Sequence, residues 1–129
     1  MEIKSELNSI NDVTQVLDKL LINETNSSAT TKGVVFQFVG QGVLKVGIAS
    51  ELFKSNEVFR STLERCDKYV KSVKQYGVIE LLYPSGSTTD AESKLHETQY
   101  AQPILVSIEC SMADMWRSKG IHPEAVLGR

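Results

Sequence analysis

The sequence predicts an α/β fold with an incomplete parallel sheet. Helices join the strands and make up most of the fold. Three observations lead to this prediction. Residues 34–39 (VVFQFV) are almost continuously apolar and rich in β-branched and aromatic side chains, which is typical of a strand buried on both faces. Residues 125–127 (AVL) read as a second short strand. Between the two, apolar residues recur at helical spacing.

The first 22 residues are expected to form an amphipathic helix. Between residues 3 and 22 the apolar side chains are spaced three or four apart, which places them in one stripe. They are Ile3, Leu7, Ile10, Val13, Leu17, Leu20 and Leu21. This helix either packs on its own domain or docks on another chain. Residues 23–32 (NETNSSATTK) are polar and aperiodic and predict a linker, so the packed domain spans residues 33–129.

Two helices are predicted after the first strand. Residues 43–54 carry Leu44, Ile48 and Leu52 at helical spacing, and Asn56 can cap a helix over residues 57–74. The stripe expected to be buried on the second helix is Val58, Phe59, Leu63, Cys66, Tyr69, Val70 and Val73. Residues 78–83 are a short apolar piece, and residues 84–90 (PSGSTTD) predict a loop.

The clearest predicted helix begins near Pro103. The ring is expected in the first turn, where the missing N–H costs nothing, and Gly120 is expected to end the helix. One face is expected to carry Ile104, Leu105, Ile108, Met112, Met115 and Trp116.

The composition excludes several function classes. The chain has 129 residues with a net charge of −2, and no stripe of Lys and Arg suggests a nucleic-acid partner. No leader sequence and no run of membrane-spanning length is evident, so the expected compartment is the cytoplasm. Two cysteines are too few for a disulfide framework or a metal site, and we expect neither metal nor cofactor.

The loop Gly40-Gln41-Gly42 follows the first predicted strand. Glycines there let backbone N–H groups point into the crevice at the carboxyl end of a strand, where they can hold a phosphate or an oxyanion. Taken alone, the pattern favours a tight turn without chemistry, because it lacks the spacing of a dinucleotide fingerprint or a P-loop.

Five stretches taken in order resemble one family over residues 34–128. They are VFQFVGQG, VFRSTLERCD, LLYP, the AQP start of a helix, and WRSKGIHPEAVLG. The sequence is similar to the malonyl/acyl-CoA:acyl-carrier-protein acyltransferases, and most of all to the acyltransferase domains of modular polyketide synthases. The resemblance implies that the fold is the N-terminal part of an α/β-hydrolase-like large subdomain.

The resemblance also implies site residues. Gln41 matches the glutamine whose backbone N–H forms part of the oxyanion hole, within the loop of Gly40 and Gly42. Gln102 matches a glutamine that lines the active-site cleft at a helix N-terminus. The implied partners are acyl carrier protein or other synthase modules.

The sequence departs from the family pattern at three places. Val43-Leu44 stand where the family has Ser-Gln, and Val39 stands where it has Pro or Thr. Arg129 stands where the family continues into a His-Ser-x-Gly nucleophile elbow, so no catalytic residue is expected within these 129 residues. The later arginine for the acyl carboxylate and the histidine base are absent too, which weakens the case for acyl-CoA binding.

No other residue is expected to replace the nucleophile. His96 and His122 are predicted to be solvated surface residues, and Cys66 and Cys110 small core residues. The hydroxyls of Ser107 and Ser111 are expected to bond back to the preceding helical turn.

Three hypotheses follow: an acyltransferase fragment inactive alone, one half of a split acyltransferase, or a non-catalytic scaffold docking through residues 3–22. Exposed apolar faces would favour self-association.

Overall fold

The computed structural model describes residues 33–128, which fall into two compact units. The larger unit is Gly40–Ile121, and the other consists of the strands with their neighbouring residues, 33–39 and 122–128. The helix predicted within residues 1–22, the linker at 23–32 and Arg129 lie outside the described residues.

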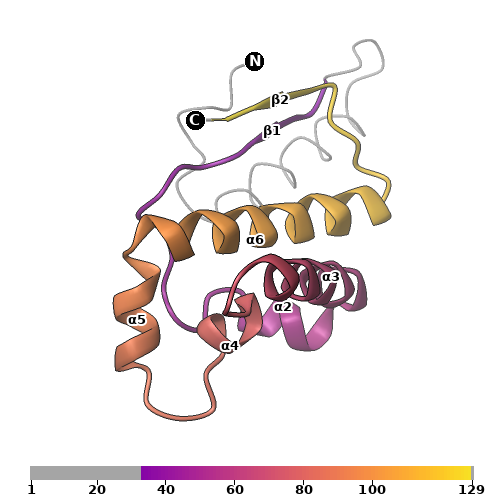
Figure 1. The fold of residues 1–129 in the computed structure, drawn as a ribbon. Helices are drawn as coiled ribbons and strands as arrows, with labels where there is room; N and C mark the ends of the chain where they lie inside the picture. The colour runs from indigo at the N-terminus through magenta and orange to yellow at the C-terminus, as the bar shows by residue number, and fades with distance from the viewer. Residues whose placement is uncertain (1–32, 129) are drawn as a thin grey trace. The chain divides into compact units, whose positions relative to one another are not determined.

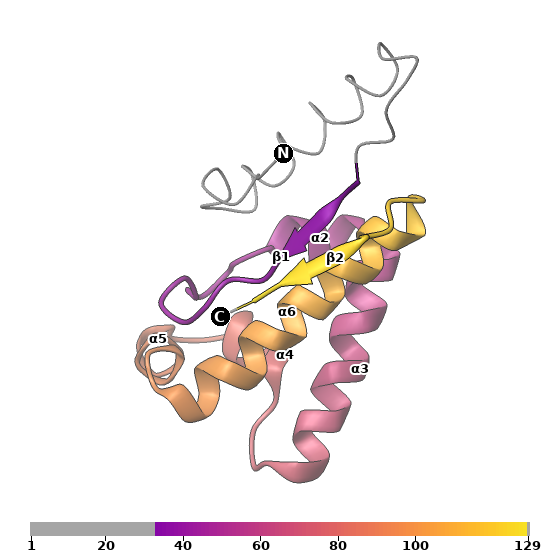
Figure 2. The ribbon, with the colours of Figure 1, turned by 90° about the horizontal axis from the view of Figure 1, so that it is seen from above.

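The two predicted strands form a parallel pair. β1 (Val35–Gln37) and β2 (Ala125–Leu127) run in the same direction, as the arrows in Figure 2 show. The register pairs are Val35 with Ala125, Phe36 with Val126, and Gln37 with Leu127. The expectation that residues 34–39 are buried on both faces is wrong, because β1 is half-buried. β2 is exposed, which agrees with the exposed apolar faces expected of an incomplete sheet. A two-stranded sheet cannot cover its own faces.

Backbone bonds extend the ladder beyond each strand end. The Glu124 N–H donates to the Val34 carbonyl (2.8 Å), and the Phe38 N–H donates to the Leu127 carbonyl (2.7 Å). The sequence therefore located both pairing segments, although the regular part of β1 is shorter than the predicted residues 34–39.

The larger unit is built from five helices, shown in Figure 1. They are α2 (Ser50–Ser55), α3 (Glu57–Val73), α4 (Val78–Leu82), α5 (Thr89–Leu95) and α6 (Thr98–Ser118). The long helices α3 and α6 lie side by side in Figures 1 and 2, and the apolar core lies between them and α4. Its largest fully buried apolar side chains are Phe59, Leu63, Val78, Leu82 and Ile104.

Helix α3 begins where the sequence predicts, and Phe59, Leu63 and Val70 of the predicted stripe are buried, but the edges of the buried face differ from the prediction. The Asn56 side chain accepts the Phe59 N–H (3.0 Å), the predicted N-cap. Three residues of the predicted stripe are exposed: Val58, Tyr69 and Val73. The buried face instead includes Thr62 and Asp67, because both polar side chains find hydrogen-bond partners on other elements.

Helix α6 begins at Thr98, five residues before Pro103, so the prediction of proline in the first turn is wrong. A proline at this depth leaves the carbonyl of residue i−4 without its helical N–H partner. That carbonyl belongs to Gln99, and the Tyr76 hydroxyl donates to it at 2.7 Å. A tertiary contact thus replaces the missing hydrogen bond and lets the helix start earlier.

The end of α6 follows the prediction. Gly120 has φ of +84°, the left-handed conformation that favours glycine. The Gly120 N–H donates to Arg117 (3.0 Å) and the Ile121 N–H to Trp116 (3.1 Å). These two bonds satisfy carbonyls that would otherwise be unpaired, in the pattern of a Schellman motif.

The helix predicted over residues 43–54 is mostly absent. Only α2 is helical, and residues 46–49 form turns. Gly47 (φ +84°) and Ala49 (φ +57°) both have left-handed backbones, which a continuous right-handed helix cannot contain. Of the three spaced apolar residues only Leu52 lies on a helix, whereas Leu44 and Ile48 lie in the loop before it.

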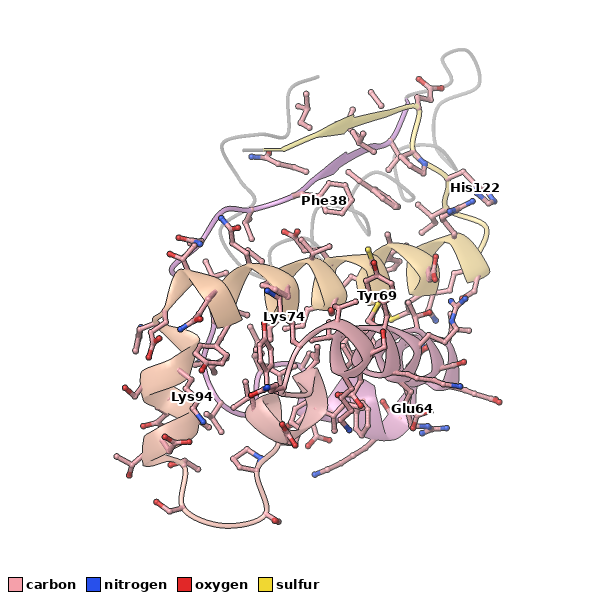
Figure 3. All side chains as sticks on the ribbon, in the orientation of Figure 1. Phe38, Glu64, Tyr69, Lys74, Lys94 and His122 are labelled. Atoms are coloured by element: carbon pink, nitrogen blue, oxygen red, sulfur yellow. The ribbon has the colours of Figure 1, made fainter. Side chains whose placement is uncertain are left out.

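Two short helices were not predicted. The apolar residues 78–83 form α4 and Tyr83. Helix α5 starts within the predicted loop 84–90, with Ala91 and Leu95 buried one turn apart. Lys94, labelled in Figure 3, pairs with Asp90 on the same helix (2.9 Å).

Candidate functional site

The loop Gly40–Gly42 leaves β1 as an open bend. Gln41 and Gly42 are exposed, and Gly42 has φ of +100° with open space where a β-carbon would lie. Glycine is therefore required there by backbone conformation rather than by packing. An oxyanion-binding loop needs backbone N–H groups that a substrate can reach, and Gln41 and Gly42 lie on the exposed surface.

The segment that follows the glycine loop is pinned by the LLYP residues. The Gly47 N–H donates to the Leu82 carbonyl (2.8 Å). The Tyr83 hydroxyl donates to the Ile48 carbonyl (2.8 Å), and its ring lies 5.0 Å from that of Phe53. The LLYP residues thus serve as the scaffold for the chain just after the glycines, a role that the sequence did not reveal.

The burial of Leu44 explains one departure from the family pattern, the leucine that stands where the family has glutamine. Its side chain is buried, whereas that of Val43 is exposed. The apolar residue in place of a family glutamine therefore anchors the loop to the helical core.

Burial raises the pKa of Tyr83 to about 12. The unfolded phenol titrates near pH 10, so the raised value means that folding favours the neutral hydroxyl. Its stabilising contribution is complete below about pH 10 and is lost as the pH rises through about 12. We expect Tyr83→Phe to remove the highest step of a tyrosinate absorbance titration. Loss of a step near pH 10 instead would contradict this assignment.

Gln102 lies on α6 and its side chain is exposed. Because α6 begins at Thr98, Gln102 is in the second turn rather than at the helix N-terminus, and its N–H lies within the helical hydrogen-bond ladder. Only its side chain is available to a cleft. No hydrogen bond or ion pair within residues 33–128 joins Gln102 to Gln41.

The strand pairing brings together the two chain segments that follow β1 and β2, at the carboxyl end of the sheet. Because β1 and β2 are parallel and in register, their carboxyl ends lie together. β1 continues into Val39 and the glycine loop, and β2 continues into Gly128. A β-carbon on Gly128 would lie 4.0 Å from Phe38 Cβ, which shows how closely the two exits approach.

The side chains that were considered as replacement nucleophiles are mostly where the sequence placed them. His96 is exposed, as is His122, which Figure 3 labels. The Ser107 hydroxyl donates to the Pro103 carbonyl (2.6 Å) and that of Ser111 to the Ser107 carbonyl (2.7 Å), as predicted. The cysteine prediction is wrong, because Cys66 is half-buried and Cys110 exposed.

Sequence reasoning missed a polar cluster that joins α3 to α6. The Thr62 hydroxyl donates to Asp114 Oδ2 (2.9 Å), and Arg65 Nη2 lies 3.2 Å from the same oxygen. The cluster lines an open groove of about 330 Å³ together with Glu57, Val58 and Ser61. A separation of 52 residues between Thr62 and Asp114 leaves no local pattern to find. These groups satisfy one another, so the cluster serves packing.

Asp67 is a second polar residue that only the structure reveals. It is buried, and its Oδ1 accepts the Ile79 N–H (3.0 Å) in the first turn of α4. Its Oδ2 pairs with Lys71 Nζ at 2.8 Å, and this hydrogen bond raises the pKa of Lys71. A β-carbon on Gly77 would overlap both side chains, so glycine is needed for this close approach.

We expect Asp67→Ala to destabilise the helical unit by about 1–3 kcal/mol, because the part-buried Ile79 N–H loses its acceptor. Asp67→Asn keeps an acceptor oxygen and loses only the ion pair to the half-exposed Lys71, so it should cost less. Urea unfolding followed by circular dichroism measures both. Equal losses would mean that the charge, and not the hydrogen bond, matters.

Among residues 33–128, no group of three His, Cys, Asp or Glu side chains is arranged to hold a metal ion. Within the same range, no helix has both the length and the apolar character that a bilayer span requires.

Comparison with known proteins identifies the family. The family model described as "Acyl transferase domain" matches residues 35–129. A highly reducing polyketide synthase of Aspergillus ruber is 33% identical over 110 residues, which is 83% of this chain and 5% of the synthase. Erythronolide synthase EryA2 of Saccharopolyspora erythraea is 32% identical over 97 residues, covering 75% of this chain and 3% of the synthase.

Solved structures agree. The acyl transferase domain of ZmaA superposes with a TM-score of 0.74 and 30% identity, over 78% of this chain and 23% of that chain. A loading acyltransferase from the avermectin modular polyketide synthase gives a TM-score of 0.64 and 34% identity, over 74% and 29%. This chain thus spans less than a third of the solved chains and about a twentieth of the synthases or less. The chain belongs to the acyl transferase domain family, and it is a fragment of a domain of the polyketide synthase type.

Proposed function

We propose that residues 33–129 are the N-terminal part of an acyltransferase that moves malonyl or related acyl groups from coenzyme A to an acyl carrier protein. In this proposal Gln41 contributes its backbone N–H to the oxyanion hole, and Gln102 lines the cleft. The nucleophile, its base and the carboxylate-binding arginine must come from residues other than 1–129, so the 129 residues alone are inactive.

The observation that carries the proposal is that the carboxyl ends of β1 and β2 lie side by side. In the family that this sequence resembles, the strand matching residues 125–128 leads into the serine elbow. The parallel register brings the exit of that strand beside the exit of β1, which leads to the glycine loop. An oxyanion hole requires donors within hydrogen-bond reach of the reacting carbonyl, and a shared carboxyl end of two paired strands is the arrangement that favours such a site.

The exposure of β2 supports completion of the site by further chain, continuous or separate. Val126 is 61% exposed and Leu127 is 42% exposed, although both are apolar strand residues. Parallel sheets in α/β proteins have both faces covered by other elements. A second polypeptide that supplies these elements is the split-enzyme form of the same proposal.

The sequence suggests the remaining parts of the proposal. Residues 1–22 would dock on a synthase partner, and residues 23–32 would act as the linker. The acyl transfer would take place in the cytoplasm, as a step of polyketide or fatty-acid synthesis. The relatives are multidomain synthases, which agrees with carrier protein or other modules as partners.

A completed chain tests the proposal. Residues 1–128 are joined to the part of the ZmaA domain that begins at its nucleophile elbow, and transfer is measured from a panel of acyl-CoA thioesters, malonyl-CoA included, to a carrier protein. We expect transfer by the chimera and none when its elbow serine is replaced by alanine. A chimera that melts cooperatively and yet transfers no acyl group would count against the proposal.

A further inference from the structure

The register of α3 against α6 can be read from two tertiary contacts. Thr62 on α3 bonds Asp114 on α6 (2.9 Å), and Tyr76, just after α3, bonds Gln99 near the start of α6 (2.7 Å). As residue numbers rise along α3 they fall along α6, so the two helices are antiparallel. Figures 1 and 2 both show them side by side.

This register places the two cysteines of the chain opposite each other. Cys66 lies one turn after Thr62 on the same face of α3, and Cys110 lies one turn before Asp114 on the same face of α6. Moving one turn along each antiparallel helix from a hydrogen-bonded pair leads to the next facing pair. Both cysteines are free thiols.

Solvent can reach the pair at the edge of the helix interface, whereas its electrostatic surroundings disfavour the thiolate, so oxidation should be faster at alkaline pH. Cys110 is exposed and Cys66 is half-buried, so reagents in solution can reach the pair. Partial burial raises the pKa of Cys110, and the negative charges of Cys66, Asp114 and Glu109 raise it further. The influence of Cys66 on the pKa of Cys110 agrees with the helix register, which places the two residues in the same neighbourhood.

We propose that Cys66 and Cys110 form a dithiol site that two-electron oxidants of the hydroperoxide class convert to an interhelical disulfide. One thiolate attacks the O–O bond and becomes a sulfenic acid, while the peroxide oxygen that leaves takes up a proton as water or alcohol. The second thiolate attacks the sulfenic sulfur and expels hydroxide, which leaves as water. Two thiols are oxidised and one peroxide is reduced. A dithiol reductant converts the disulfide back to two thiols.

The disulfide would tie α3 to α6 at the edge of their interface. The site is independent of acyl transfer, because neither cysteine belongs to the proposed oxyanion loop or cleft. It would instead make the packing of the helical unit responsive to oxidation.

The full 129-residue chain tests the proposal directly. The reduced chain is exposed to hydrogen peroxide at mildly alkaline pH, quenched with an alkylating reagent and analysed by intact mass and peptide mapping. We expect both thiols to disappear together in the monomer, the mass to fall by two hydrogen atoms, and one cross-linked peptide pair to contain Cys66 and Cys110. Thiols that both remain alkylatable, or only dimers linked between chains, would overturn it.

A register-shifted pair provides the matched control. In Val106→Cys/Cys110→Ser the second thiol moves back one turn along α6, to a position that is exposed like Cys110. A disulfide requires Cα atoms within about 7 Å, so we expect the shifted pair to close at least about tenfold more slowly. In concentrated urea both pairs should close at similar rates, because the register is lost. Equal rates in the folded proteins would overturn the proposed pairing.

Discussion

Replacing Phe59 by alanine is expected to destabilise the helical unit by about 3–5 kcal/mol, the usual cost of removing a buried phenylalanine ring. Phe59 has no exposed surface and lies on the buried face of α3. The substitution removes the hydrophobic transfer energy of the ring and leaves a cavity that its neighbours only partly fill. Small domains are stable by only about 5–15 kcal/mol, so this loss is a large fraction of the total and should lower the urea midpoint markedly.

Urea unfolding followed by helical circular dichroism measures this loss, with Tyr69→Ala as the matched control. Tyr69 is on the same helix but 70% exposed, so its replacement should change the free energy of unfolding by about 0.5 kcal/mol or less. Similar effects of the two substitutions would mean that α3 does not pack through the face assigned to it.

Replacing Gln41 by proline in the completed chimera is expected to lower kcat about 10²–10³-fold. Proline removes the backbone N–H that is proposed to hold the oxyanion, and losses of this size follow removal of one such donor. Because the donor acts on the transition state, KM should change little. This prediction depends on the proposed function.

Gln41→Ala separates the backbone from the side chain. It keeps the N–H, and the exposed glutamine side chain has no hydrogen bond among those described for residues 33–128, so activity should stay within a few-fold of the parent chimera. Equal losses in the alanine and proline variants, at unchanged melting temperature, would show that the side chain and not the N–H acts.

Local patterns were enough to predict much of the fold. Asn56 caps α3 and Gly120 ends α6 because capping depends on a few neighbouring residues, all visible in the sequence. The two strands were located from short apolar runs, and the parallel pairing agrees with the helices between them.

The errors came from tertiary contacts. Tyr76 compensates for Pro103, so α6 begins earlier than a proline rule allows. Thr62 and Asp67 are buried because α6 and α4 supply their hydrogen-bond partners, so the buried face of α3 includes two polar residues that its apolar spacing does not predict. The conformation of loop residues 43–49 is fixed by hydrogen bonds to Leu82 and Tyr83, and their helical spacing therefore does not produce a helix.

The candidate site was only partly visible in the sequence. The glycines of Gly40–Gly42 mark a backbone with special conformation, and Gly42 indeed has positive φ. The Tyr83 hydroxyl that pins the Ile48 carbonyl is 35 residues away along the chain, so no spacing rule could assign it.

Residues 1–129 are proposed to hold part of an oxyanion-binding loop and no nucleophile, and intact mass after incubation with malonyl-CoA tests this claim most directly. The Cys66→Ser/Cys110→Ser variant is used so that chemical thioester exchange with the thiols cannot occur. We predict an unchanged mass for the folded chain. A malonyl ester on any of its side chains, formed faster than in the urea-unfolded chain, would contradict the claim.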